Sequence, residues 1–238
     1  MRNILLEIEY DGTDYFGWQY QPNKKTIQGT IEETLKKFLN EPINLIGTSR
    51  TDAGVSALGQ VANFLCNSQL SVKSIQAALN SSLPRDIYIK KAYSVHLLFH
   101  ARFDAKSKIY RYQIIFGRSP LRQRFAWALK YRLNVARMEQ TSELFIGNKD
   151  YHWFCETKNE NGYVNVMDIN FKKNQDLAIE IEANRFLYKM VRRIVGALVD
   201  IGRGRINKQD ILNRFLNKKH KPLIVAPPSG LVLLKVKY

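Results

Sequence analysis

Apolar residues recur along this chain with two different periods, and segments of the two kinds alternate. Period-2 alternation or a short apolar run is typical of a strand, whereas apolar residues three and four positions apart are typical of a helix. In the first half this pattern predicts strands over residues 4–10, 43–47, 60–66 and 87–93. It predicts helices after the N-caps Thr26 and Ser71, ending before Pro42 and near Ser82.

The second half shows a similar mixture of strands and helices. The pattern predicts strands over 108–116, 163–171, 177–183 and 231–237 and helices over 135–146, 187–201 and 208–217. Such an order is typical of split βαβ units. We therefore predict an α+β fold of two similar halves, residues 1–105 and 106–238, each a mixed or antiparallel, ferredoxin-like sheet covered by helices. We expect the two sheets to meet around a central cleft, where ligands commonly bind.

The chain is strongly basic, and this points to a polyanionic partner. It has 37 Lys and Arg against 21 Asp and Glu, a formal net charge of +16. Nucleic acid and anionic membranes are the usual partners of such a field. No apolar segment approaches the roughly 18 residues of a membrane span, so nucleic acid is favoured and no membrane association is expected. The first residues lack a signal-peptide core, which predicts a cytoplasmic protein.

The cysteines and histidines do not form a metal-binding pattern. Cys66 and Cys155 lie far apart without CxxC spacing, so we expect both to be reduced and packed. His96 and His100 are four residues apart, as two ligands on a helix would be, but Leu97, Leu98 and Phe99 between them supply no carboxylate. We therefore predict no metal site.

One carboxylate occupies a distinctive turn, in the stretch Arg50-Thr51-Asp52-Ala53-Gly54-Val55. The turn follows a short apolar run, and Gly54 can supply the positive φ that a tight turn requires. Asp52 is therefore a candidate catalytic carboxylate, with Arg50 as a local cationic partner. The alternative is an Asx-turn, in which Asp52 only helps the chain to change direction.

Two further segments carry candidate binding residues, and each has a structural alternative. From Lys106 to Tyr112 cations alternate with aromatic residues, as expected of a surface that binds phosphates and stacks bases. Alternatively, Tyr110, Tyr112, Ile114 and Phe116 form one face directed into a core. Arg192 and Arg193 flank the apolar stripe of the predicted helix over 187–201 on opposite sides, and periodicity does not decide which of them faces a cleft.

Taken in order, these segments resemble the tRNA pseudouridine synthase A family over nearly the whole chain. The matching residues are Tyr10-Asp11-Gly12, Phe16-Gly17-Trp18-Gln19, Arg50-Thr51-Asp52-Ala53-Gly54-Val55, Gly59-Gln60-Val61, Phe99-His100-Ala101-Arg102-Phe103, Tyr110-Arg111-Tyr112, Asn184, Phe186, Met190-Val191-Arg192, Ile194-Val195-Gly196 and Gly230-Leu231. Matches in this order and at these distances are far more specific than any one of them.

The resemblance implies an isomerase that converts uridine to pseudouridine in the anticodon stem-loop of tRNA, at family positions 38, 39 and 40, without a redox cofactor, nucleotide or metal. It implies a homodimer with the target uridine bound between the two halves. Asp52 would be the essential carboxylate, as a nucleophile on the sugar or base or as a base at C2′. Arg192 would pair with Asp52, with Arg50 as the competing local partner, and Tyr110 would stack on the uracil.

Two departures from the family pattern concern RNA positioning more than the reaction. Ser56 stands where the family commonly has His, and the segment Asn161 to Val166 lacks the usual Arg-Thr-Ile-like tract. Two rival functions remain at this stage. One is a non-catalytic module that binds structured RNA, and the other is a metal-assisted nuclease using scattered carboxylates.

Overall fold

The computed structural model describes residues 1–156, 161–219 and 221–238, and the chain forms two compact units. Unit 1 comprises Met1–Lys106 together with Val232–Tyr238, and unit 2 comprises Ser107–Leu231. The last strand therefore belongs mainly to the unit built by the N-terminal residues, whereas the sequence pattern placed it in the second half.

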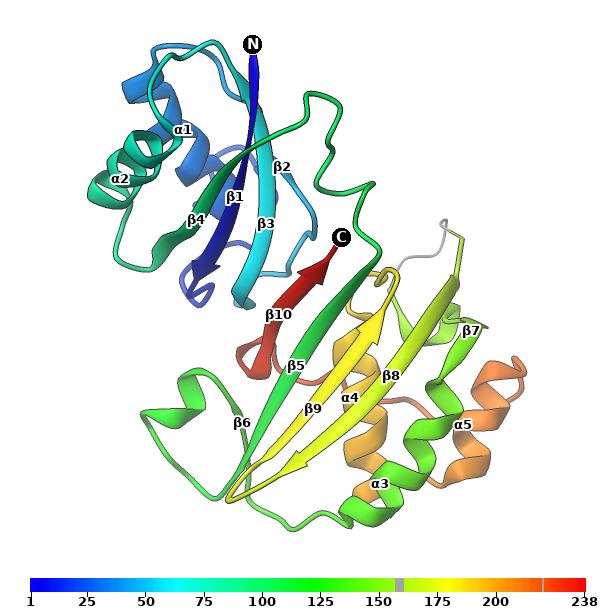
Figure 1. Cartoon of the computed structure of the whole chain (residues 1–238). Coiled ribbons are helices and arrows are strands. Elements are labelled where there is room, and N and C mark those ends of the chain that lie inside the picture. Colours follow the sequence, from blue (N-terminus) through cyan, green and yellow to red (C-terminus); the bar gives the residue numbers. More distant parts are fainter. Residues whose placement is uncertain (157–160, 220) are drawn as a thin grey trace. The chain divides into compact units, whose positions relative to one another are not determined.

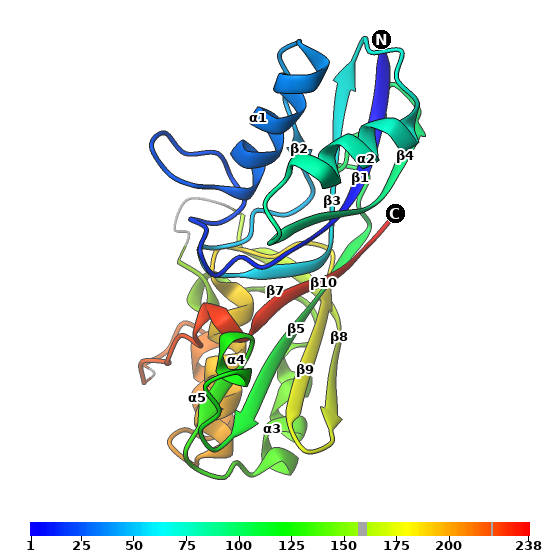
Figure 2. The ribbon, with the colours of Figure 1, turned by 90° about the vertical axis from the view of Figure 1, so that its left-hand side faces the viewer.

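Unit 1 is an antiparallel sheet covered by helices on one face (Figures 1 and 2). The strand order is β4-β1-β3, and β2 pairs with β3. The first residues of β10 pair with β3 in parallel. Its elements are β1 (Arg2–Tyr10), α1 (Ile27–Leu39), β2 (Ile46–Gly47), β3 (Ser56–Cys66), α2 (Val72–Ser82), β4 (Ile87–Val95) and β10 (Leu231–Lys237).

Local sequence signals account for the elements of unit 1. The Thr26 side chain accepts a hydrogen bond from the Gly29 N–H at the start of α1, and Ser71 caps α2 in the same way. In β1, alternate residues Ile4, Leu6 and Ile8 are fully buried, so the period-2 pattern does mark the face that meets the helices.

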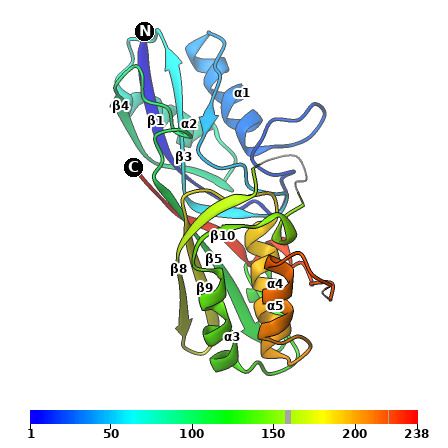
Figure 3. The same ribbon diagram turned by 90° about the vertical axis from the view of Figure 1, so that its right-hand side faces the viewer.

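Unit 2 has the same layered arrangement, with α3, α4 and α5 on one face of its sheet (Figure 3). The strand order is β5-β9-β8-β7, all antiparallel, and β6 pairs with β5 in parallel. Its elements are β5 (Ser107–Phe116), β6 (Trp127–Leu129), α3 (Val135–Ser142), β7 (Gly147–Asp150), β8 (Tyr163–Lys173), β9 (Leu177–Ala183), α4 (Met190–Gly202) and α5 (Lys208–Phe215).

The two units share a common connectivity. In unit 1 the spatial order β1-β3-β2 is built by β1, a helix, the β2–β3 pair and a second helix. In unit 2 the order β5-β9-β8 is built likewise, by β5, α3, the β8–β9 pair and then α4. This confirms the prediction of an α+β fold with two similar halves of the split βαβ kind.

Several boundaries differ from those predicted, for tertiary reasons. The apolar run 43–47 forms strand pairing only at Ile46–Gly47, and β3 begins at Ser56 because pairing with β1 continues past the apolar residues. The helix predicted over 187–201 begins at Met190, since Lys189 has a left-handed φ of 58°. The short strands β6 and β7 carry no period-2 pattern and were not predicted. None of the helices in the described part of the chain is long and apolar enough to cross a membrane.

Candidate active site

The Asp52 turn follows β2 and precedes β3 in unit 1. The Val55 N–H donates to the main-chain carbonyl oxygen of Asp52 at 3.1 Å, which closes the turn. Gly54 has a φ of 77°, as predicted from its place in the motif. The Asp52 side chain is half-buried, whereas Arg50 is exposed on the same loop. The hydrogen bond that closes the turn involves the Asp52 backbone and not its carboxylate.

The segment from Tyr10 to Trp18 holds this turn through three hydrogen bonds. Tyr10 Oη and Thr51 Oγ1 share a buried hydrogen bond of 2.8 Å. The Trp18 N–H donates to the Thr51 carbonyl oxygen at 3.1 Å, and the Gly54 N–H donates to the Tyr15 carbonyl oxygen at 3.3 Å. The residues on both sides of Asp52 are thus fixed by groups from β1 and the loop after it, which pre-organises the carboxylate.

Close backbone packing reinforces these hydrogen bonds. A Cβ atom at Gly17 would lie 2.6 Å from the Thr51 carbonyl oxygen, and Gly17 has a φ of 87°. A Cβ atom at Gly12 would lie 2.0 Å from the Val55 carbonyl oxygen. Both glycines of the sequence motifs therefore permit one loop to lie directly against the other.

The two departures from the family pattern have structural roles here. The Gly12 N–H donates to the Ser56 hydroxyl oxygen at 3.0 Å, so Ser56 joins the end of the Asp52 turn to the loop after β1. Within the segment Asn161 to Val166, β8 begins at Tyr163, and Val164 and Val166 are buried in unit 2.

Tyr110 lies on β5 in unit 2, on the face that it shares with Tyr112 and Ile114. All three residues are buried, and the Tyr110 ring meets Phe186 edge-on at 5.1 Å between centroids. Phe116, at the end of the same face, is exposed instead. Tyr110 is thus buried, as expected if this face of β5 packs into a core. Its ring also packs on Phe186, which lies shortly before α4.

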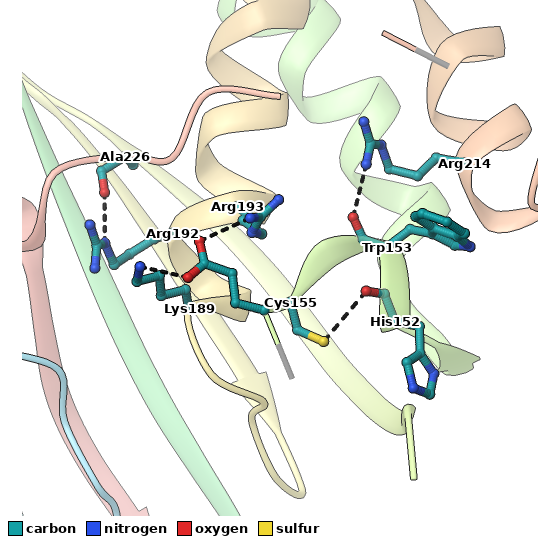
Figure 4. Close-up of polar contacts among 9 residues, drawn as sticks. His152, Trp153, Cys155, Lys189, Arg192, Arg193, Arg214 and Ala226 are labelled. Carbon is teal, nitrogen blue, oxygen red and sulfur yellow. Dashed lines mark hydrogen bonds and ion pairs between the residues drawn. The ribbon is translucent and has the colours of Figure 1, made fainter. Parts of the chain in front are cut away.

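Arg192 lies in the first turn of α4 and contacts the chain that precedes β10. Its Nε–H donates to the Ala226 carbonyl oxygen at 2.7 Å, and the Ala226 N–H donates to the Arg192 carbonyl oxygen at 3.1 Å (Figure 4). Residues 222–230, here called the C-terminal linker, run along α4. A Cβ atom at Gly196, one turn on, would lie 1.9 Å from the Ile224 carbonyl oxygen.

The same linker reaches β5. The Tyr112 hydroxyl donates to the Pro227 carbonyl oxygen at 2.8 Å, and Gly230 lies against the Tyr112 ring. Burial raises the pKa of Tyr112 well above its usual value, so this hydroxyl remains a donor at neutral pH. Arg192 and the Tyr110 strand are therefore both positioned by one segment, which the sequence analysis did not identify because it has no regular periodicity.

The four candidate residues divide between the units. Arg50 and Asp52 share one loop of unit 1, and Tyr110 and Arg192 belong to unit 2. The pairing of Asp52 with Arg192 and the cleft between the halves remain predictions. In unit 1 the backbone of the Asp52 turn is held by hydrogen bonds to the segment from Tyr10 to Trp18. In unit 2 Arg192 is held by a hydrogen bond to the C-terminal linker.

Not every cation of the basic segments is available to a ligand. Arg214 is 4% exposed, donates to the carbonyl oxygens of Trp153 and Lys221 at 2.9 and 2.5 Å, and has a pKa lowered by burial to about 10. It joins α5 to the segment around Trp153 (Figure 4) and to the chain at Lys221. Arg214 is thus a structural residue rather than an RNA contact.

His96, His100 and the two cysteines have local roles. The Nδ1 atoms of His96 and His100 accept backbone N–H groups of their own loops. Cys66 and Cys155 are free thiols and buried, as predicted. In the described ranges, no group of three or more His, Cys, Asp and Glu side chains is placed to hold a metal ion.

Comparison with known proteins extends over the whole chain. A family model described as tRNA pseudouridine synthase matches residues 7–104 and 142–238. The chain is 43% identical over 245 residues to the tRNA pseudouridine synthase A of a Thermoanaerobacter species, with 100% of both chains covered. It is 46% identical over 244 residues to the protein of the same name from Caldicellulosiruptor saccharolyticus, again with 100% of both covered. Among solved structures, an archaeal box H/ACA Nop10–Cbf5 complex is similar at 10% identity and a TM-score of 0.38, over 83% of this chain and 44% of that chain.

Proposed function

Because the chain belongs to the tRNA pseudouridine synthase family and is therefore an isomerase acting on tRNA uridines, we propose that its targets lie in the anticodon stem-loop, at family positions 38, 39 and 40. The observation that carries the residue assignment is the Asp52 turn. A half-buried carboxylate lies there in a turn held by hydrogen bonds at Thr51 and Gly54, in a motif that matches the family.

The reaction breaks the N1–C1′ bond of uridine, turns the base and forms a C5–C1′ bond. C5 loses a proton and N1 gains one, so the atoms balance without an oxidant or reductant. Positive charge develops at the sugar during cleavage, and a carboxylate stabilises or captures it. Asp52 supplies this anion, as a nucleophile on the sugar or base or as a base at C2′.

The second unit supplies the groups that complete the site. Arg192 pairs with Asp52, and this pairing keeps the carboxylate ionised against the desolvation of a closed site. Tyr110 stacks on the target uracil. Arg50, exposed beside Asp52, contacts the RNA. The bracing of Arg192 and β5 by the C-terminal linker supports these roles, because both groups need fixed positions.

The target base must leave its stack before Asp52 reaches the sugar, at a cost of a few kcal/mol. Contacts between phosphates and basic residues offset this cost. The basic segments that we assign to this role include Arg118, Arg124, Lys130, Arg132, Arg203, Arg205 and Lys208. We further propose that the enzyme works in the cytoplasm as a homodimer, which light scattering during size exclusion would reveal as a mass of two chains.

The decisive experiment is pseudouridine mapping on an unmodified tRNA transcript by carbodiimide-stopped reverse transcription. The wild-type protein alone should produce stops at the anticodon stem-loop positions. Asp52→Ala and Asp52→Asn should yield no product while binding the transcript as tightly as the wild type. Parallel loss of binding and product would instead assign Asp52 to the structure of the loop.

The same experiment separates the rival functions. A non-catalytic RNA-binding module leaves the transcript unmodified although it binds it. A metal-assisted nuclease cuts the transcript, and cutting stops when EDTA is added. Stops at uridines outside the anticodon stem-loop would refute the proposed target positions while leaving the reaction intact.

A further inference from the structure

Three cations lie within little more than one turn at the start of α4. They are Lys189, Arg192 and Arg193. The N-terminus of a helix carries partial positive charge, so cations are unfavourable there. Like charges three and four residues apart at a helix end repel one another. A cluster of this kind needs a compensating anion.

Glu156 is that anion. Its carboxylate accepts from Lys189 Nζ at 2.6 Å and from an Arg193 guanidinium nitrogen at 2.9 Å (Figure 4). Its backbone N–H also donates to the Tyr188 carbonyl oxygen at 3.1 Å. The Lys189 hydrogen bond lowers the pKa of Glu156, and Glu156 in turn raises the pKa of Lys189 despite the Arg192 charge.

The network lies at the surface, and its side chains are only partly exposed. The side chains of Lys189, Arg193 and Glu156 are 25%, 21% and 30% exposed. Lys189 also has a left-handed backbone, which is costly for a residue with a side chain. Glu156 thus fixes both the side chains and the chain path that leads into α4.

Arg192 has a different set of contacts from its neighbours. Figure 4 shows its guanidinium directed to Ala226. Lys189 and Arg193 both donate to the Glu156 carboxylate instead. Two cations of the cluster are therefore engaged by one carboxylate, and the third is held by the C-terminal linker. This separation distinguishes Arg192 from Arg193, the other guanidinium of the cluster, which donates to Glu156.

We propose that Glu156 is a positioning residue for the isomerisation. It retains Lys189 and Arg193, so that Arg192 is the cation of this cluster that pairs with Asp52. This inference rests on the proposed function. Without the Glu156 charge, Lys189 and Arg193 become available to RNA phosphates and compete with Arg192 for the Asp52 carboxylate.

The test is Glu156→Gln, which keeps the side-chain shape and removes the charge. On the unmodified transcript we expect kcat to fall at least tenfold. In an Asp52→Asn background, we expect Glu156→Gln to tighten binding of the same transcript and to steepen the slope of log affinity against log salt. Each additional phosphate contact adds about 0.7 to 0.9 to that slope. A merely structural role would weaken binding together with kcat.

A matched control is available in Glu180, which also bridges an arginine and a lysine in unit 2. Its carboxylate lies 2.8 Å from Arg111 and 2.9 Å from Lys172, and it is away from α4 on β9. Glu180→Gln should leave kcat unchanged, because the cations that it releases, Arg111 and Lys172, lie on β5 and β8 and not on α4. The variant Glu156→Gln/Lys189→Gln/Arg193→Gln, which lacks the competing cations, should recover most of the kcat lost in Glu156→Gln.

Several outcomes would overturn the inference. Two concern Glu156→Gln itself, namely a wild-type kcat or weaker RNA binding. The third is an equal loss of kcat in Glu180→Gln. The fourth is a triple variant that has the wild-type melting temperature but recovers no kcat. The wild-type protein on the same transcript separates this failure from that of the proposed function. If the wild type forms no pseudouridine, the proposed function fails; if it does, only the role of Glu156 is refuted.

Discussion

At the scale of single residues, the backbone beside Asp52 leaves no room for a side chain at Gly17. The Thr51 carbonyl oxygen that faces Gly17 also accepts the Trp18 N–H, so it is held in place from two directions. A side chain at Gly17 would push this oxygen away and move the next residue, Asp52. A catalytic group misplaced by 1 Å costs about 100-fold in rate.

We therefore expect Gly17→Ala to lower kcat for pseudouridine formation by about 100-fold, because it displaces the Asp52 turn. The control is Gly117→Ala. Gly117 has nearly the same φ, 86° against 87° for Gly17, but no atom lies within 4 Å of its added Cβ. Gly117→Ala should cost only the left-handed backbone penalty, about 1 kcal/mol of unfolding free energy, and leave kcat intact. Equal kinetic effects of both substitutions would contradict the role assigned to the close approach.

At the scale of elements, α4 and the C-terminal linker form one positioning unit. The contacts recur at every turn of the helix, at Arg192, Gly196 and Asp200. Their spacing of four residues places them on one face. The linker then continues to Tyr112 on β5. A displacement of the linker should therefore move both Arg192 and the strand that carries Tyr110.

Gly196→Ala tests this arrangement. In an ordinary helix interior the change from Gly to Ala stabilises by about 1 kcal/mol. Here the added Cβ would meet the Ile224 backbone at 1.9 Å, so we expect a loss of about 1 to 3 kcal/mol in unfolding free energy and a reduced kcat. Thermal unfolding and steady-state kinetics measure both quantities.

Gly202→Ala on the same helix is the matched control for Gly196→Ala. Its nearest neighbours are side-chain atoms of Met138 and Leu133, and the flexible Met138 thioether can move aside. Gly202→Ala should therefore leave kcat near that of the wild type. If Gly196→Ala is as active as Gly202→Ala, the linker does not position Arg192.

The helices and strands that are defined by local sequence signals could be predicted from the sequence. The caps Thr26 and Ser71, the stripe of α4 and the alternating residues of β1 all lie where the pattern predicted. It missed β6, β7 and the linker, because their backbone partners come from distant residues and leave no local period. Glu156 was missed for the same reason: its partners lie 33 and 37 residues away.

The candidate site was predictable to a different degree. The family resemblance nominated Asp52, Arg50, Tyr110 and Arg192 as candidates, because each lies in a short motif that can be read from the sequence, and their roles remain predictions. It gave no indication of what holds them. The bracing by Tyr10, Gly17 and the linker depends on contacts between segments, which appear only in three dimensions.

At the scale of the whole molecule, the formal charge of +16 should dominate the energetics of tRNA binding. We expect the affinity for an unmodified tRNA transcript to fall steeply with salt, since each phosphate neutralised contributes about 0.7 to 0.9 to the slope. Fluorescence anisotropy over a KCl series with Asp52→Asn measures this slope without turnover. A slope near zero would contradict an electrostatic binding surface.

The return of β10 to unit 1 has a consequence for biosynthesis. Val232 and Leu233 pair with β3, and the Tyr238 hydroxyl donates to the Ala101 carbonyl oxygen at 2.8 Å. During translation residues 1–106 emerge long before β10. While unit 2 is being synthesised, β3 therefore lacks its pairing with β10. We therefore expect a chain truncated within unit 2 to aggregate more readily than the full chain, because its β3 edge lacks the β10 pairing.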